Sequence, residues 1–209
     1  MESNKLLDIL LLPKQVYQKL TDKKPFLYGG IIFVGAVDMV FPLIDHRIMV
    51  FGGKSTGMLN YNVGLAIIFI LILGFVDVLF FGLPMFDFFR ILKKEGPLFT
   101  NANLIRFTKS YILAHFLIVP FNAVFYCIMY NEQTSKAYPQ IVIVIAALYY
   151  FFLMPAWFSG IIARGTNVIF DIEPNKKPLI YAAIFTWNFI LSNYAFSYMI
   201  EHWVMWFFR

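Results

Sequence analysis

The sequence predicts an all-α, polytopic membrane protein with five transmembrane helices and short amphipathic cytoplasmic segments. Its 209 residues are 60% hydrophobic and 14% charged, which leaves too few charges to cover a water-soluble domain. Five apolar stretches are each long enough to cross about 30 Å of hydrocarbon at about 1.5 Å per residue. Stretches such as residues 65–73 are apolar without alternation, so they do not fit the two-residue period of a membrane β-barrel.

Residues 1–24 form an amphipathic lead before the first span. Between Leu6 and Leu20, Leu, Val and Tyr alternate with Lys, Gln and Asp, and Pro13 divides the stretch into two short helical segments. Two placements fit this pattern. The lead can lie along the inner leaflet with its lysines toward lipid phosphates, or it can pack as a helix on the cytoplasmic face of the bundle.

The five predicted spans follow one another with short polar connections. In chain order they are residues 26–44, 61–86, 107–130, 139–163 and 179–200. After the second span, residues 88–96 form another amphipathic segment that a Gly-Pro pair ends. Pro120 and Pro155 lie inside the third and fourth spans, where each removes a backbone hydrogen bond and favours a kink. The connections are too short for a second domain, so we expect residues 1–209 to form a single transmembrane domain.

The distribution of basic residues predicts the orientation of the bundle. Thirteen of the seventeen Lys and Arg fall on the side of the N-terminus: five in the lead, five in the second connection and three in the fourth. The other side carries four, which are Arg47, Lys54, Lys136 and Arg209. Because positive flanks resist translocation, we expect the N-terminus in the cytoplasm and the C-terminus outside. The net charge of +5 then reflects topology and contact with anionic headgroups, and there is no compact basic domain for nucleic acid.

Ionisable and amide side chains inside the spans are the candidate site residues, because each is costly in lipid and should face the bundle interior or water. They are Asp38, Asp77, His115, Asn122, Asn188 and Asn193. At about 1.5 Å per residue from the cytoplasmic end of each predicted span, these six residues fall into two layers of different depth. One layer, at about 12 to 14 Å, contains Asp77, His115 and Asn188. The other, at about 18 to 23 Å, contains Asp38, Asn122 and Asn193.

These layers predict a charge-assisted pair between Asp77 and His115, with the asparagines satisfying the remaining donors and acceptors. Two interpretations fit. The layers are a proton or cation relay or a metal site built on Asp and His, or they are interhelical hydrogen bonds that hold the bundle together. At the cytoplasmic ends of spans two and four, Asp87 and Arg164 predict an ion pair, with a headgroup contact of Arg164 as the alternative.

Catalytic patterns are nearly absent from the sequence. The stretch AWFSG, residues 156–160, resembles the site of an intramembrane serine protease, but Trp157 stands where the first glycine is needed. Gly52 and Gly53 precede Lys54 and Ser55 but lack the upstream glycine of a phosphate-binding loop. We therefore expect a protein that is not an enzyme and that holds no cofactor or metal ion.

Several further features run along nearly the whole chain. They are LLLP at Leu10–Pro13, Pro25 and Phe26 at the entry to span one, Tyr111 and Pro120 in span three, and PAWFSGIIARGTNVIFDI at Pro155–Ile172. Their order resembles the small bacterial members of the Yip1 superfamily. The resemblance implies five spans, a cytoplasmic N-terminus, a C-terminus outside and a location in the bacterial cytoplasmic membrane.

The resemblance does not extend to every property of that superfamily. Its eukaryotic members carry a long cytoplasmic N-terminal region, act in vesicle trafficking and interact with small Rab GTPases. The lead here is short, and their Asp-Leu-Tyr-Gly-Pro motif is absent from the sequence. Rab binding is therefore not implied for this chain.

Two functions fit these observations. The first is a non-enzymatic membrane protein that organises membrane lipids or partner proteins through its cytoplasmic amphipathic segments and bundle surface, as a homodimer or with another membrane protein. The second is a small transporter or ion-conducting protein that uses Asp38, Asp77 and His115.

Overall fold

The computed structural model describes residues 5–92, 100–130 and 139–209, and these residues form helices and turns with no β-strand. Five helices are long and apolar enough to cross a membrane, namely Lys24–Asp45, Thr56–Leu92, Asn101–Tyr126, Gln140–Ile169 and Pro174–Phe208. The predicted all-α class and the predicted number of spanning-length helices are confirmed. The helix ends differ from the prediction, since the second helix continues to Leu92 instead of ending at residue 86. Residues 93–96 of the predicted amphipathic segment lie outside the described residues.

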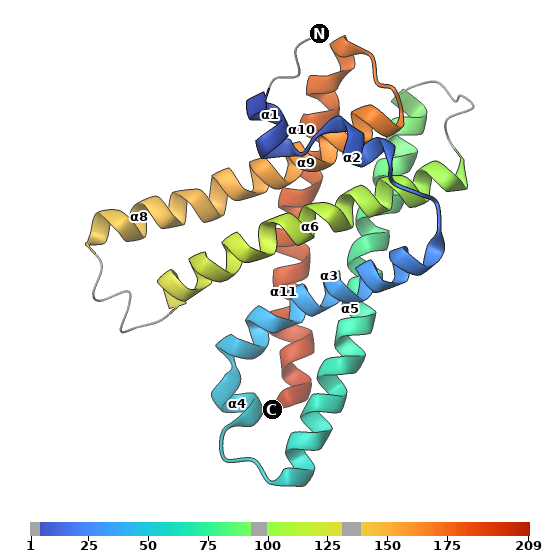
Figure 1. Cartoon of the computed structure of the whole chain (residues 1–209). Helices are drawn as coiled ribbons and strands as arrows, with labels where there is room; N and C mark the ends of the chain where they lie inside the picture. Colours follow the sequence, from blue (N-terminus) through green and yellow to red (C-terminus); the bar gives the residue numbers. More distant parts are fainter. Residues whose placement is uncertain (1–4, 93–99, 131–138) are drawn as a thin grey trace.

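The lead forms two short helices, α1 (Lys5–Leu11) and α2 (Lys14–Gln18). The elements that follow are α3 (Lys24–Asp45), α4 (Arg47–Phe51), α5 (Thr56–Leu92), α6 (Asn101–Tyr130), α8 (Gln140–Leu148), η1 (Tyr149–Leu153), α9 (Met154–Ile169), η2 (Pro174–Lys176), α10 (Lys177–Ile190), η3 (Leu191–Phe196), α11 (Ser197–Met199), η4 (Ile200–Val204) and η5 (Met205–Phe208). α5 and the last segment, from α10 to the C-terminus, run alongside each other, and α3 and α6 cross them obliquely (Figure 1). We call the end of the bundle that carries α1, α2, the end of α9 and the start of α10 the N-terminal face.

Two glycines allow α3 and α5 to cross with their backbones in contact. A Cβ atom added to Gly35 would lie 2.7 Å from the backbone nitrogen of Gly74. A Cβ atom added to Gly74 would lie 2.8 Å from the backbone nitrogen of Gly35. Small residues at helix crossings are typical of membrane proteins, where close van der Waals packing replaces the hydrophobic effect between helices.

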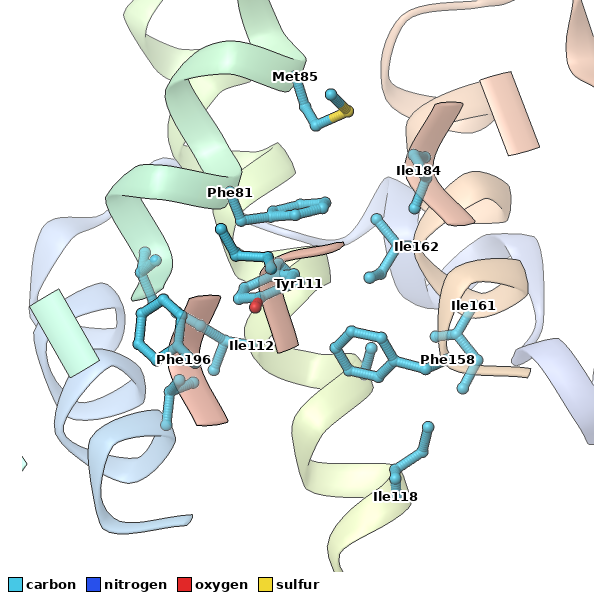
Figure 2. Packing of buried hydrophobic residues seen from close by; sticks show 14 of the residues in the cluster. Phe81, Met85, Tyr111, Ile112, Ile118, Phe158, Ile161, Ile162, Ile184 and Phe196 are labelled. Carbon is cyan, nitrogen blue, oxygen red and sulfur yellow. The ribbon is translucent and has the colours of Figure 1, made fainter. Parts of the chain in front are cut away.

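Aromatic side chains fill the core between α5, α6 and α9. The rings of Phe81 and Tyr111 stack at a centroid distance of 4.0 Å and an interplanar angle of 12°. Figure 2 shows this pair facing Phe158 and Ile162 of α9, with Ile184 of α10 beyond them. The four helices are therefore packed around one continuous apolar cluster.

The lead packs on the bundle, which is the second of the two predicted placements. The Tyr17 side chain is fully buried, and its hydroxyl is 2.8 Å from the carbonyl oxygen of Leu11 and 2.9 Å from that of Ile161 in α9. Burial raises the pKa of the Tyr17 hydroxyl above its ordinary range, and the Arg164 charge acts in the opposite direction, so the group stays a neutral donor. A Cβ added to Gly165 would lie 2.8 Å from the Tyr17 ring, so the missing side chain makes room for it.

Two basic residues of α6 bind main-chain carbonyl groups where the lead joins α3. Lys109 Nζ lies 2.6 Å from the carbonyl oxygen of Thr21 and 2.8 Å from that of Lys23. Arg106 Nε donates to the carbonyl oxygen of Leu20 at 2.9 Å. Leu20 and Thr21 belong to an irregular segment, and Lys23 is the N-cap residue of α3, so α6 supplies donors to carbonyl groups where the lead joins that helix.

The fourth spanning segment changes its helical form at the middle. α8 passes into the π-helical turn η1, and Pro155 follows at the start of α9. Because proline has no N–H group to donate to the preceding turn, a wider turn accommodates the mismatch. Apolar side chains of α8 and η1, including Ile145 and Phe152, are exposed, as expected for a surface that faces lipid. Pro120 lies inside α6, which continues to Tyr130.

Candidate functional site

Asp77 of α5 and two residues of α6 form a buried polar cluster. The Tyr111 hydroxyl lies 2.9 Å from each carboxylate oxygen of Asp77 and donates its hydrogen to them. His115 follows Tyr111 by one helical turn, and its Nε2 lies 3.7 Å from Asp77 Oδ2. Asp77 is 5% exposed and Tyr111 is 1% exposed. The structure thus brings the predicted partners Asp77 and His115 together and adds Tyr111 as a third member.

The two ring nitrogens of His115 face different groups. Nδ1 lies 3.1 Å from the carbonyl oxygen of Tyr111, and it carries a hydrogen because a carbonyl group only accepts hydrogen bonds. Nε2 faces the Asp77 carboxylate. Without a further proton, lone pairs of Nε2 and Oδ2 would face each other in a low-dielectric interior, which is unfavourable. The Asp77–His115 pair is therefore best satisfied when it holds one additional proton.

Asp38 of α3 belongs with this cluster, although the predicted layers separate it from Asp77. The Asp38 carboxyl group lies within electrostatic range of Asp77, and its buried Oδ2 has no hydrogen-bond partner among the described residues. The helix ends explain the correction, because α5 and α6 extend beyond the predicted spans. Counted along each helix from Lys24, Leu92 and Asn101 at about 1.5 Å per residue, Asp38, Asp77 and His115 all lie about 21 to 23 Å from the N-terminal side.

The predicted asparagines do not complete this cluster. Asn188 is buried, and its Nδ2 donates to Ser159 Oγ at 3.2 Å, which connects α10 to α9. The side-chain oxygens of Asn122 and Asn188 are buried and accept no hydrogen bond within the described part of the chain. The side chain of Asn193 lies outside those that the structure describes.

Tyr111 is the member of the buried cluster that a search for charged and amide groups inside the spans misses. A tyrosine also has an apolar ring, so its presence in an apolar helix carries no signal by itself. Its position four residues before His115 puts both side chains on one face of α6. That spacing is the signal that identifies it as a partner of Asp77.

The ion pair predicted between Asp87 and Arg164 is wrong. The Arg164 guanidinium forms an ion pair with Asp8 of α1. Asp87 lies 3.7 Å from Arg90, one turn further along α5. The docking of α1 on α9 brings the Asp8 carboxylate to Arg164 in place of Asp87.

A groove of about 670 Å³ opens at the N-terminal face between the lead, α9 and α10. Among the described residues, three cationic side chains line it, those of Lys14, Arg164 and Lys177, together with one carboxylate, that of Asp171. Its apolar wall includes Leu7, Leu11 and Val168. Two polar atoms of its lining residues, Arg164 Nε and Asn167 Oδ1, are buried and have no hydrogen-bond partner among the residues that the structure describes.

The two sites offer different chemistry. In the described segments, no group of three His, Cys, Asp or Glu side chains is arranged to hold a metal ion. The buried cluster can hold a proton or connect α3, α5 and α6. The groove combines cations with an apolar wall at one end of the bundle, so it can bind an anion that carries an apolar group.

Comparison with protein-family models, curated proteins and solved structures finds no match to this chain. The described residues define a class, which is an all-helical protein with five helices long and apolar enough to cross a membrane. The resemblance to the Yip1 superfamily stays a prediction.

Proposed function

We propose that this chain is a non-enzymatic integral membrane protein of the Yip1-like type that organises membrane lipids or partner proteins at its cytoplasmic face. The docked lead carries the proposal. α1 and α2 are held on the bundle by the buried Tyr17 and by the ion pair of Asp8 with Arg164. They form a fixed surface with a groove that is lined by cations. A fixed basic surface at one end of an apolar bundle suits binding at the boundary between membrane and cytoplasm.

The proposed orientation follows from charge. Thirteen of the seventeen Lys and Arg lie on the side of the N-terminus, and basic segments are retained in the cytoplasm. In this orientation the N-terminal face meets the anionic inner leaflet of a membrane, which we propose to be the bacterial cytoplasmic membrane. The proposed partners are membrane lipids and, at the exposed apolar helix surfaces, a second copy or another membrane protein.

A small transporter or ion-conducting protein is the second candidate. The observation that favours it is the Asp38 carboxyl group, which lies near Asp77 and has a buried Oδ2 with no partner among the described residues. Two neighbouring carboxyl groups and a histidine inside a membrane can exchange a proton. Against a metal cation bound at Asp77, the Tyr111 hydroxyl already contacts both oxygens of that carboxylate.

Flux measurements on reconstituted liposomes separate the two candidates. We expect the wild-type protein to move protons and metal cations no faster than protein-free liposomes do, and to retain membrane lipid through purification. We expect charge reversal of Lys19 and Lys23 to weaken lipid retention, whereas Asp77→Asn and His115→Ala leave it unchanged in protein that still folds. Flux that Asp77→Asn abolishes would overturn the proposal in favour of transport.

A further inference from the structure

We propose that the groove at the N-terminal face is a binding site for one anionic phospholipid. The phosphate group lies among Lys14, Arg164 and Lys177, and one acyl chain lies along the apolar wall toward the bundle. This inference rests on the proposed function and names the ligand and the residues that would bind it.

The charge of the groove matches a phosphodiester. Three cations and one carboxylate line it, and the Arg164 guanidinium also pairs with Asp8. Lys14 and Lys177 are exposed and form no ion pair with a carboxylate of the described residues. Arg164 Nε is buried and has no partner in the described segments. The groove thus holds unused donors and an excess of positive charge, which a phosphate with a single negative charge would balance.

The shape of the groove fits an acyl chain beside that phosphate. Ala156, Gly160 and Ala163 line it from α9 at spacings of four and three residues, so they share one face of the helix. A Cβ added to Gly160 would lie 3.1 Å from Leu11 Cδ2, which shows how closely the lead approaches this face. Small side chains on α9 and leucines on the lead together form the apolar part of the lining.

A lipid satisfies this groove better than a free phosphate ion does. An inorganic phosphate would contact the cations but would leave the apolar wall of Leu7, Leu11 and Val168 exposed to water. An acyl chain covers that wall, and the burial of each methylene group against it favours binding. The groove also lies where α9 and α10 leave the apolar spans, at the depth of the lipid headgroups in the proposed orientation.

Native mass spectrometry of the full chain tests the site. The purified protein is incubated with equal amounts of phosphatidylglycerol and phosphatidylethanolamine. The bound lipid is then identified from the mass that it adds to the protein. We expect one phosphatidylglycerol on the wild type. Each of Lys14→Gln and Lys177→Gln should lower its affinity about fivefold, since a basic residue near a membrane surface contributes about 1 kcal/mol. Ala156→Leu should lower it without a change of charge, because the added side chain fills the apolar part of the groove.

Lys176→Gln is the matched control. Lys176 neighbours Lys177, but its Nζ lies 3.0 Å from Glu173 and it does not line the groove. We expect its lipid affinity to equal that of the wild type. Circular dichroism checks that each variant stays folded, which the exposure of Lys14 and Lys177 favours.

Three outcomes would overturn the site. They are unchanged phosphatidylglycerol binding in the Lys14→Gln, Lys177→Gln double variant, an equal loss in Lys176→Gln, and displacement of the lipid by millimolar inorganic phosphate, which would indicate a site for the free ion. Lipid retained elsewhere, together with no ion flux, would leave the proposed function standing without this site. Asp77-dependent flux with no retained lipid would remove both.

Discussion

Gly35 of α3 and Gly74 of α5 lie against each other so closely that neither position has room for a methyl group. The obstacle at each position is the backbone of the other helix, which cannot rotate away as a flexible side chain can. Asp38 and Asp77 follow these glycines by three residues on the same two helices, and their carboxyl groups interact electrostatically.

Gly74→Ala should destabilise the protein. The added methyl group would meet the backbone of Gly35 and push α3 away, and overpacking of this kind costs about 1 to 3 kcal/mol of unfolding free energy. Unfolding in mixed detergent micelles, followed by circular dichroism, measures the change. Gly29→Ala is the control, because a Cβ there meets nothing within 4 Å and alanine favours a helix. Equal unfolding free energies for the two variants would show that the crossing has room for a methyl group.

Tyr111→Phe should lower the unfolding free energy by about 1 to 3 kcal/mol, because it leaves the buried Asp77 carboxylate without its hydroxyl donor. The same unfolding measurement on Tyr111→Phe, Asp77→Ala and the double variant gives the coupling energy of the pair. We expect a coupling of about 0.5 to 3 kcal/mol. Tyr28→Phe is the control, since Tyr28 is 58% exposed. A coupling near zero would contradict the hydrogen bond.

Asp8→Asn should release α1 from α9. The partner of Asp8 is the Arg164 guanidinium, and both side chains are largely shielded from water, with 23% and 13% exposed. We expect hydrogen exchange of the backbone amides of α1 to become about tenfold faster, as the loss of one charged hydrogen bond predicts. Asp87→Asn removes a more exposed pair within α5 and should leave α1 unchanged. Equal exchange in the two variants would show that the ion pair does not hold the lead.

Lys109→Met should free the segment between α2 and α3. The methionine keeps the apolar stem but loses the donors to the carbonyl oxygens of Thr21 and Lys23. We expect trypsin to cleave after Lys19 and Lys23 several times faster than in the wild type, because cleavage requires a segment that can leave the bundle. Lys54→Met, in the connection between α4 and α5, is the control, and trypsin should cleave it after Lys19 and Lys23 at the wild-type rate. Unchanged cleavage in Lys109→Met would argue that other contacts hold this segment.

The number of long helices could be read from hydropathy, because about twenty consecutive apolar residues form a helix in lipid to satisfy their backbone groups. Their ends could not. Asp87 and Arg90 lower the hydropathy after residue 86, yet they pair with each other one turn apart and the helix continues to Leu92. That extension changes the depth of Asp77 and explains why Asp38 joins it.

The site could be predicted only in part. Asp77 and His115 stand out because ionisable groups are rare inside apolar spans, and the structure brings them together. Tyr111 does not stand out, since an aromatic ring belongs in such a helix. The groove has no local signal at all, because its cations come from α2, α9 and α10.

The sequence by itself determined the helical class, the five long helices and the basic N-terminal side, because hydropathy and charge belong to the chain whatever its packing. Only the tertiary structure decided which residues meet. α5 is apolar on nearly every side, so no stripe in its sequence marks the face that turns toward α3 or α6. The Gly35–Gly74 crossing selects the face of α5 that meets α3. The rotation of α5 about its axis then brings Asp77 to Tyr111, and the docking of the lead brings Asp8 to Arg164.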